Sequence, residues 1–172
     1  MKPRDEAIPV DPDAPVDLTT RLTGEHNQAL KLWLRMLACT VRVEDAIRSR
    51  LRATFGITLP RFDLMAQLER QPAGLRMGEL SKRMMVTGGN VTGIVSQLEG
   101  EGLVARVPDP EDGRAFVVRL TPQGRRAFAQ MAEVHEGWVA DLFADIPAAD
   151  QATMVALLDG MKRRLNDNKD EE

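Results

Sequence analysis

Short polar side chains alternate with glycines through residues 87–97, a combination that suits contact with another surface. Asparagine and glutamine can pair with adenine through two hydrogen bonds, serine and threonine can reach a base or a phosphate, and a threonine methyl can touch thymine. An interior helical glycine costs about 1 kcal/mol relative to alanine, so repeated glycines favour close approach to the floor of a major groove. The candidate contact residues in this segment are Thr87, Gly89, Asn90, Thr92, Gly93, Ser96 and Gln97.

A helix from about Gly88 to Glu101 is needed to present these residues on one side. Thr87 is its expected N-cap, because the hydroxyl can accept a hydrogen bond from a free N–H of the first turn, and Gly102 can supply the positive φ that ends a helix. The opposite side has the i, i+3, i+4, i+7 spacing of a core-facing stripe. That stripe consists of Val91, Ile94, Val95 and Leu98. The alternative is that the polar side is only a solvated helix face.

Two β-prone runs follow, residues 104–107 and 115–120, and in the second Phe116, Val118 and Leu120 alternate with Val117 and Arg119. The prolines, aspartates and glycine between the runs predict a hairpin with an irregular tip. At that tip the Asp112 carboxylate could hold the Arg114 guanidinium extended, which would suit a narrow, negative minor groove. An ordinary surface salt bridge is the alternative for this pair.

Residues 77–84 have the pattern of a short helix before the glycine-rich one, so the order is helix, turn, helix and hairpin wing. Candidate phosphate contacts in this helix are Ser81 and Lys82, with Arg83 and Arg106 as further candidates. Each of the four could equally be a solvated surface group.

The block V-T-G-G-N-V-T-G-I-V-S-Q-L-E-G-E-G-L-V-A-R, followed by D-P-E-D-G-R-A-F-V-V-R-L-T-P-Q-G, resembles the MarR family of bacterial winged-helix transcriptional regulators. The similarity rests on the D-x-R of the wing, at residues 112–114, and the L-T-x-x-G at residues 120–124, and it extends over about residues 26–166. It implies a reading helix at residues 88–101 and a minor-groove contact by Arg114. It also implies a regulator, most often a repressor, whose DNA is released when a small anionic aromatic effector binds.

The expected fold is mainly α with a small β-hairpin wing, namely a winged helix-turn-helix lobe plus a terminal-helix dimerisation region. The segments are a mobile acidic tail (1–25), an N-terminal dimerisation helix (26–57, helical from about 27 to 54), the DNA-binding lobe (58–122), C-terminal dimerisation helices (123–166) and a polar tail (167–172). Wide apolar stripes on the terminal helices predict a homodimer, as the resemblance does. Its two-fold axis would place the reading helices about 34 Å apart on a palindromic double-stranded DNA operator.

The resemblance also implies an effector pocket between the dimer helices and the reading lobe. Its candidate residues are Trp33, Met36, Phe62 and Met65, among which soft methionines could accommodate a flat aromatic carboxylate or phenol. The alternative is that these four residues are simply core.

The net charge of −3 is unevenly distributed along the chain. Residues 26–125 carry 15 basic and 10 acidic groups, whereas residues 126–172 carry 5 and 10. The basic excess therefore coincides with the predicted reader, and binding should depend on a few phosphate contacts and weaken with salt.

Other function classes find little support in the sequence. His26 and His135 are far apart and Cys39 is the only cysteine, so no metal set, cofactor or nucleophile with a base is expected, and the protein is predicted not to be an enzyme. No apolar run approaches a membrane span, which predicts a cytoplasmic protein without a membrane partner.

Two other readings remain open. One is a winged-helix protein-interaction module that does not bind DNA, which the acidic total would suit. The other is a redox-sensing regulator acting through Cys39, although its apolar neighbours favour a buried, unreactive thiol.

Overall fold

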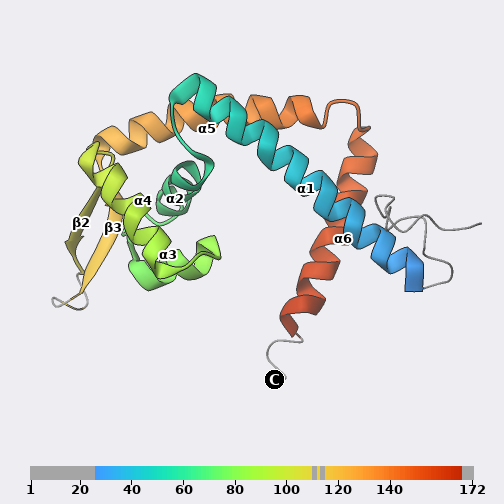
Figure 1. The fold of residues 1–172 in the computed structure, drawn as a ribbon, viewed down its shortest axis with the longest axis horizontal. Helices are drawn as coiled ribbons and strands as arrows, with labels where there is room; N and C mark the ends of the chain where they lie inside the picture. The colour runs from blue at the N-terminus through green and yellow to red at the C-terminus, as the bar shows by residue number, and fades with distance from the viewer. Residues whose placement is uncertain (1–25, 110–111, 113–114, 168–172) are drawn as a thin grey trace, which may run out of the picture. The chain divides into compact units, whose positions relative to one another are not determined.

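The computed structural model describes residues 26–109, 112 and 115–167; the predicted tail of residues 1–25 and residues 168–172 lie outside this range. The elements are α1 (His26–Phe55), α2 (Leu59–Glu69), β1 (Leu75–Arg76), α3 (Met77–Met84), α4 (Gly88–Gly100), β2 (Val104–Pro108), β3 (Phe116–Leu120), α5 (Pro122–Leu142) and α6 (Ala148–Asp167) (Figure 1). No helix in the described ranges is both long enough and apolar enough to cross a membrane. The chain divides into two compact units, residues 1–42 and 43–172.

Helix α1 confirms the predicted helix to within one residue at each end. Its apolar stripe is buried only near the C-terminal end, where Ile47 and Leu51 join the core of the second unit. The earlier stripe residues Leu30, Leu37 and Val41 are exposed, because the described part of the first unit is a single helical segment with no second layer against which to pack.

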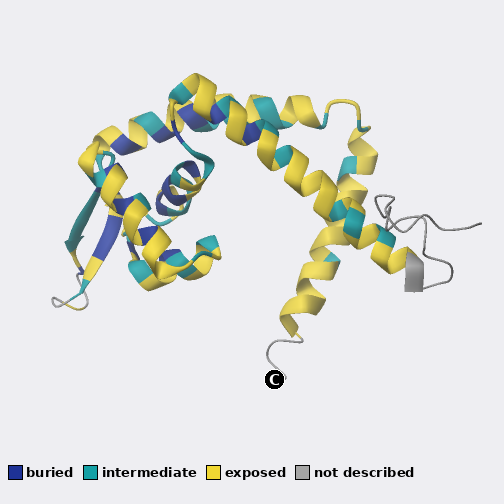
Figure 2. Ribbon diagram, in the orientation of Figure 1, coloured by how far each residue is buried: buried dark blue, intermediate teal, exposed yellow. Residues whose placement is uncertain are grey.

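One hydrophobic core joins α2, α3, α4, the sheet, the first half of α5 and the end of α1 (Figure 2). Pro60 lies in the first turn of α2, where its missing N–H costs nothing, and Phe62, Met65 and Leu68 are buried. Among the described residues, the apolar side chains with 0% exposure are Leu51, Leu64, Met65, Leu80, Val91, Val95, Leu98 and, in the wing, Val118. The two helices of the reading motif are therefore held by the same core as the wing.

The helix-turn-helix has the predicted boundaries. Helix α3 ends in a left-handed residue, Met85, with φ 54°, and α4 begins after Thr87. Thr87 is the N-cap residue, but the prediction that its hydroxyl accepts a hydrogen bond from a first-turn N–H is wrong. Its carbonyl accepts from the N–H groups of Asn90 (3.0 Å) and Val91 (3.2 Å), and because the start of α4 is exposed, water can satisfy the remaining donors.

The wing is an antiparallel three-stranded sheet in the order β1-β3-β2, whereas the sequence predicted only the hairpin of β2 and β3. Strand β1 pairs Leu75 with Val118, and two residues are too few to show an alternating pattern. Gly74 precedes it with φ 102°, and a Cβ there would lie 2.9 Å from the Val118 carbonyl oxygen. A glycine at this position lets the chain reach β3.

The alternation in β3 holds only in part. Val118 and Leu120 are buried, but Phe116 on the same face is 57% exposed and Val117 on the other face is buried. Phe116 pairs with Pro108 at the outer end of the hairpin, beyond the reach of the core.

The C-terminal helices begin and end close to their predicted positions. The Thr121 hydroxyl accepts from the Gly124 N–H at 2.9 Å, so Thr121 is the N-cap of α5. Helix α6 has no buried residue, and it is almost entirely yellow in Figure 2. Its exposed apolar side chains are Met154, Val155, Leu157, Leu158, Met161 and Leu165.

Candidate nucleic-acid interface

Helix α4 separates its apolar and polar sides cleanly. Val91, Val95 and Leu98 are fully buried and Ile94 is partly buried, so the predicted stripe is confirmed. The opposite residues Gly89, Asn90, Thr92, Gly93, Ser96 and Gln97 are all exposed. We call this exposed set the reading face of α4.

No intramolecular packing explains the glycines of α4. A Cβ built at Gly88, Gly89, Gly93 or Gly100 meets no atom within 4 Å. Alanine would therefore fit at each position within the chain and would be the better helix former. Close approach of α4 to another surface would account for small residues at these positions.

Some hydroxyl groups near the interface already form hydrogen bonds within the chain. Thr92 donates to the Gly88 carbonyl at 3.0 Å, and Ser81 donates to the Val86 carbonyl at 2.6 Å, which closes the turn before α4. The amide side chains of Asn90 and Gln97 make no hydrogen bond to another described residue. These two amides are the most available donors and acceptors on the reading face.

Helix α3 presents the basic groups that the sequence predicted near the reader. Lys82 and Arg83 lie in its last turn and are exposed. Neither is in an ion pair with another described residue. Both therefore remain predictions as phosphate contacts, whereas Ser81 has its hydroxyl directed into the turn.

The wing tip is described only in part. Arg114 lies outside the described residues, so its predicted link to Asp112 is not described, although Asp112 itself is exposed and its carbonyl accepts from Ala115 N–H at 2.8 Å. At the base of the tip, the Arg76 Nε donates to Asp109 Oδ2 at 2.6 Å. Asp109 is only 7% exposed, so this ion pair ties the end of β2 to the start of α3.

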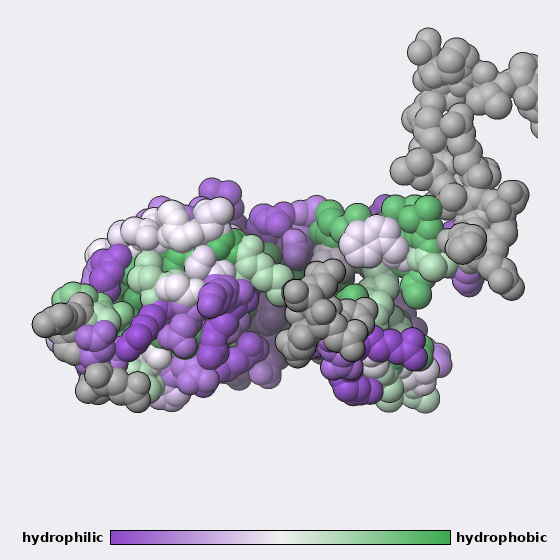
Figure 3. All heavy atoms as spheres, turned by 90° about the horizontal axis from the view of Figure 1, so that it is seen from below, coloured by the Kyte–Doolittle hydropathy of each residue, from purple (hydrophilic) through white to green (hydrophobic). Residues whose placement is uncertain are grey.

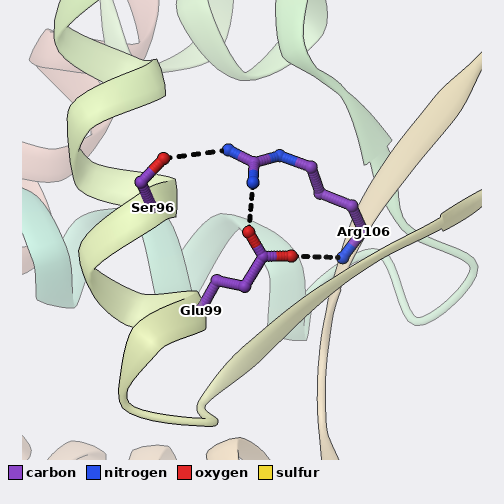
Figure 4. Close-up of polar contacts among 3 residues, drawn as sticks. All are labelled: Ser96, Glu99 and Arg106. Atoms are coloured by element: carbon purple, nitrogen blue, oxygen red, sulfur yellow. Dashed lines mark hydrogen bonds and ion pairs between the residues drawn. The ribbon is translucent and has the colours of Figure 1, made fainter.

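The side chain of Arg106, a predicted phosphate contact, is bonded to residues of α4. Its guanidinium pairs with Glu99 and donates to the Ser96 hydroxyl at 3.2 Å (Figure 4). Glu99 was not among the predicted residues, since seven positions and a change from helix to strand separate it from Arg106 in the sequence. The acidic residue in the last turn of α4 was the available signal.

The four predicted effector residues have very different surroundings. Met65 is fully buried in the core, and the Phe62 ring contacts those of Phe128 (5.4 Å between centroids) and His135 (4.8 Å). Trp33 is 56% exposed and Met36 is partly buried, and both belong to the first unit. Phe62 alone among the four lines two cavities of about 530 and 270 Å³.

Two ionisable groups beside these cavities have shifted pKa values. Desolvation lowers the pKa of the His135 imidazole below its usual 6.5, and nearby Glu136 partly opposes the shift. Desolvation, and secondly repulsion by Glu44, raises the pKa of the Asp63 carboxyl above its usual 3.8. Both shifts favour the neutral forms, so the cavity wall carries less charge than its composition suggests.

Among the described residues no three His, Cys, Asp or Glu side chains are grouped closely enough to hold a metal ion. Cys39 is exposed, so the expectation of a buried thiol is wrong, because its part of α1 has no covering layer within its unit.

A helix-turn-helix with an exposed polar reading face, followed by an antiparallel hairpin, defines a winged helix-turn-helix protein of the DNA-binding class. The MarR family profile matches residues 57–116. The crystal structure of a MarR family transcriptional regulator from Silicibacter pomeroyi is 33% identical, covers 83% of this chain and 99% of its own, and superposes with a TM-score of 0.72. The chain belongs to the MarR family of transcriptional regulators.

Two further relatives are similar over most of their length. The uncharacterised HTH-type transcriptional regulator YdgJ of Bacillus subtilis (strain 168) is 28% identical over 124 residues, or 72% of this chain and 75% of that protein. The transcriptional activatory protein BadR of Rhodopseudomonas palustris is 27% identical over 142 residues, or 78% and 81%. Both are named as regulators and neither as an enzyme.

Proposed function

We propose that this regulator is a homodimer that binds a palindromic operator, reads the major groove with α4 and acts as a repressor. The observation that carries the proposal is the reading face, which combines exposed amides with glycines that nothing inside the chain requires. A duplex groove needs both features, since side chains must reach base edges while the helix backbone comes close to the bases. A protein-interaction surface has no comparable need for base-pairing amides.

The glycines permit a test in which stability and binding change in opposite directions. Gly93→Ala should raise the free energy of unfolding by about 0.5–1 kcal/mol, because alanine is the better helix former and fits in the free chain. The same methyl group should weaken operator binding if α4 lies close to the groove floor. Gly137→Ala in α5, where a Cβ also meets nothing within 4 Å, is the matched control and should leave binding unchanged.

Binding is measured by fluorescence anisotropy on duplexes tiled across the upstream region, at two salt concentrations. Selective binding that weakens with salt and with Gly93→Ala would support the proposal. Selective binding that Gly93→Ala leaves unchanged would contradict the close approach of α4. If neither the tiled duplexes nor a random duplex library yields a selectively bound site, a winged-helix protein-interaction module becomes the better interpretation of the fold.

The homodimer is proposed from α6. This helix is 20 residues long, and none of its side chains is buried within the chain. Figure 3 shows hydrophobic surface exposed on helices outside the winged lobe. A soluble protein rarely leaves such a stripe open, and a second copy of the same helices would cover it.

The sign of regulation is proposed from the resemblance and needs its own experiment. BadR is named an activatory protein, so relatives of this chain include at least one named activator. A reporter placed behind the selected operator should lose transcription when the regulator is added. A gain of transcription would contradict the repressor assignment and would leave operator binding intact.

For the effector, the cavity of about 530 Å³ beside Phe62 is the proposed site. Its wall includes Arg70 and Arg83, which form no ion pair with another described residue, and the Phe62 ring beside His135. Arginine next to an aromatic wall suits an aromatic carboxylate or phenolate. The cavity replaces the sequence-based set, from which only Phe62 is retained.

The effector test uses a panel of aromatic carboxylates and phenols. A true effector should raise the melting temperature and release the operator, and Arg70→Gln should weaken both effects while Arg126→Gln, an exposed arginine of α5, should not. A panel without any stabilising compound would contradict this effector class.

A further inference from the structure

Three contacts join the reading helix to the wing. The Arg106 main-chain N–H donates to Glu99 Oε1 at 3.3 Å, its guanidinium pairs with Glu99 Oε2, and its Nη2 donates to Ser96 Oγ at 3.2 Å (Figure 4). Ser96 and Glu99 lie one turn apart on α4, and Arg106 is in the middle of β2. We call these three residues the brace.

The geometry of the brace restricts the rotation of β2 relative to α4 as well as the distance between them. The planar guanidinium meets two acceptors on α4, while the Glu99 carboxylate also holds the backbone of β2. A single flexible ion pair would leave the angle between helix and strand free, whereas several points of attachment do not. The Arg106 and Glu99 side chains are 32% and 37% exposed, so salt screens their attraction less than that of a fully exposed pair.

The brace also makes Arg106 less available as a phosphate contact. Glu99 balances the Arg106 charge, so the arginine offers little net attraction to a phosphate. The Arg76–Asp109 pair provides a second attachment just beyond the outer end of β2, to the last residue of β1, which is also the N-cap of α3. The described part of the wing is therefore fixed to both helices of the reading motif.

We propose that Glu99 and Arg106 are positioning residues that set the angle of the wing to the reading helix, so that one docking event engages both grooves. The inference rests on the proposed DNA-binding function. Neither residue touches DNA in this arrangement. Their contribution is to order the wing before binding, which removes an entropic cost from the complex.

The first experiment compares Glu99→Gln and Arg106→Gln on the selected operator. Each should weaken binding by about tenfold, within the range of coupling between adjacent groups. The slope of log K against log salt should stay the same, because no phosphate contact is lost, whereas Lys82→Ala should reduce that slope by about one. A reduced slope in Arg106→Gln would overturn the proposal in favour of a direct phosphate contact.

A double-mutant cycle distinguishes positioning from loss of stability. In an Arg114→Ala background, which removes the proposed wing contact, Glu99→Gln should cost much less affinity than in the wild type, and additive losses would overturn the proposal. Arg61→Gln is the matched control, since Arg61 pairs with Glu101 at the end of α4 but does not reach the wing. It should leave operator affinity unchanged.

The brace is also tested without DNA, so its failure can be distinguished from failure of the proposed function. Backbone ¹⁵N relaxation of the free protein should show lower order parameters for β2 and β3 in Glu99→Gln and Arg106→Gln, but not in Arg61→Gln. The charge exchange Glu99→Arg with Arg106→Glu should restore part of the order. A wing equally rigid in all variants would overturn the proposal whether or not the protein binds DNA.

Discussion

At the scale of single residues, hydroxyl and amide groups on the predicted interface differ in their availability. Ser81, Thr92 and Ser96 each make a hydrogen bond within the chain, while Asn90 and Gln97 make none to the described residues. A bidentate amide–adenine pair discriminates against other bases by about 1–3 kcal/mol. We therefore expect base preference to depend mainly on the two amides, and the hydroxyls to stabilise the motif itself.

His135 provides a prediction about pH. Its pKa is lowered in the folded state, so the unfolded chain binds the proton more tightly, and stability falls as the pH drops below about 6.5. His135→Gln should show a smaller loss of stability between pH 7.5 and 5.5 than the wild type, measured by urea denaturation at both values. An identical loss in both proteins would show that His135 does not carry this pH dependence.

At the scale of elements, the turn between α3 and α4 is built around a strained residue. Met85 has φ 54° and a side chain that is 92% exposed, and it ends α3 in the left-handed conformation that glycine adopts most easily. Its N–H still donates to the Lys82 carbonyl at 3.3 Å. The turn therefore keeps its hydrogen bonds at the cost of an unfavourable backbone angle.

Replacing this residue should stabilise the protein. Met85→Gly should raise the free energy of unfolding by about 1 kcal/mol, because a left-handed residue with a Cβ costs about 1–2 kcal/mol and the lost side chain makes few contacts. Met85→Ala is the control, since it keeps the Cβ and should change stability little. The expectation fails if the glycine variant is no more stable than the alanine variant in chemical denaturation.

The elements also differ in how far local sequence predicts them. The bounds of α1, α3 and α4 were predicted to within one residue, since caps and apolar spacing act over a few residues. Strand β1 was not predicted, because two residues become a strand only by pairing with β3. The exposure of Phe116 could not be predicted from the local pattern either, since it depends on how far the core extends under the wing.

At the scale of the whole molecule, the apolar stripe of α6 determines the expected assembly. Leu158→Glu places a charge in the middle of that stripe and should convert the proposed dimer to monomer at micromolar concentration, as measured by sedimentation velocity. Ala156→Glu adds the same charge on the opposite side of the helix and should leave the dimer intact. A wild-type protein that sediments as a monomer would contradict the two-fold geometry.

The uneven distribution of charge also affects DNA binding by the whole molecule. A net charge of −3 is unusual for a DNA-binding protein, but the excess of acidic groups lies toward the two ends of the chain. Pairing of Arg61, Arg76 and Arg106 with carboxylates further reduces the number of cations available to phosphate. Operator affinity should accordingly depend on a small number of contacts.

The sequence by itself determined the order of helices, the two sides of α4, the hairpin and the family resemblance, because these follow from periodicity, capping and turn chemistry between near neighbours. Only the tertiary structure decided that Arg106 pairs with Glu99, that Met65 is core and that an arginine-bearing cavity lies beside Phe62. Each of these depends on side chains brought together from separate elements, and the packing of the core sets those distances. For the same reason the intramolecular role of Ser96 was invisible until α4 and β2 were placed side by side.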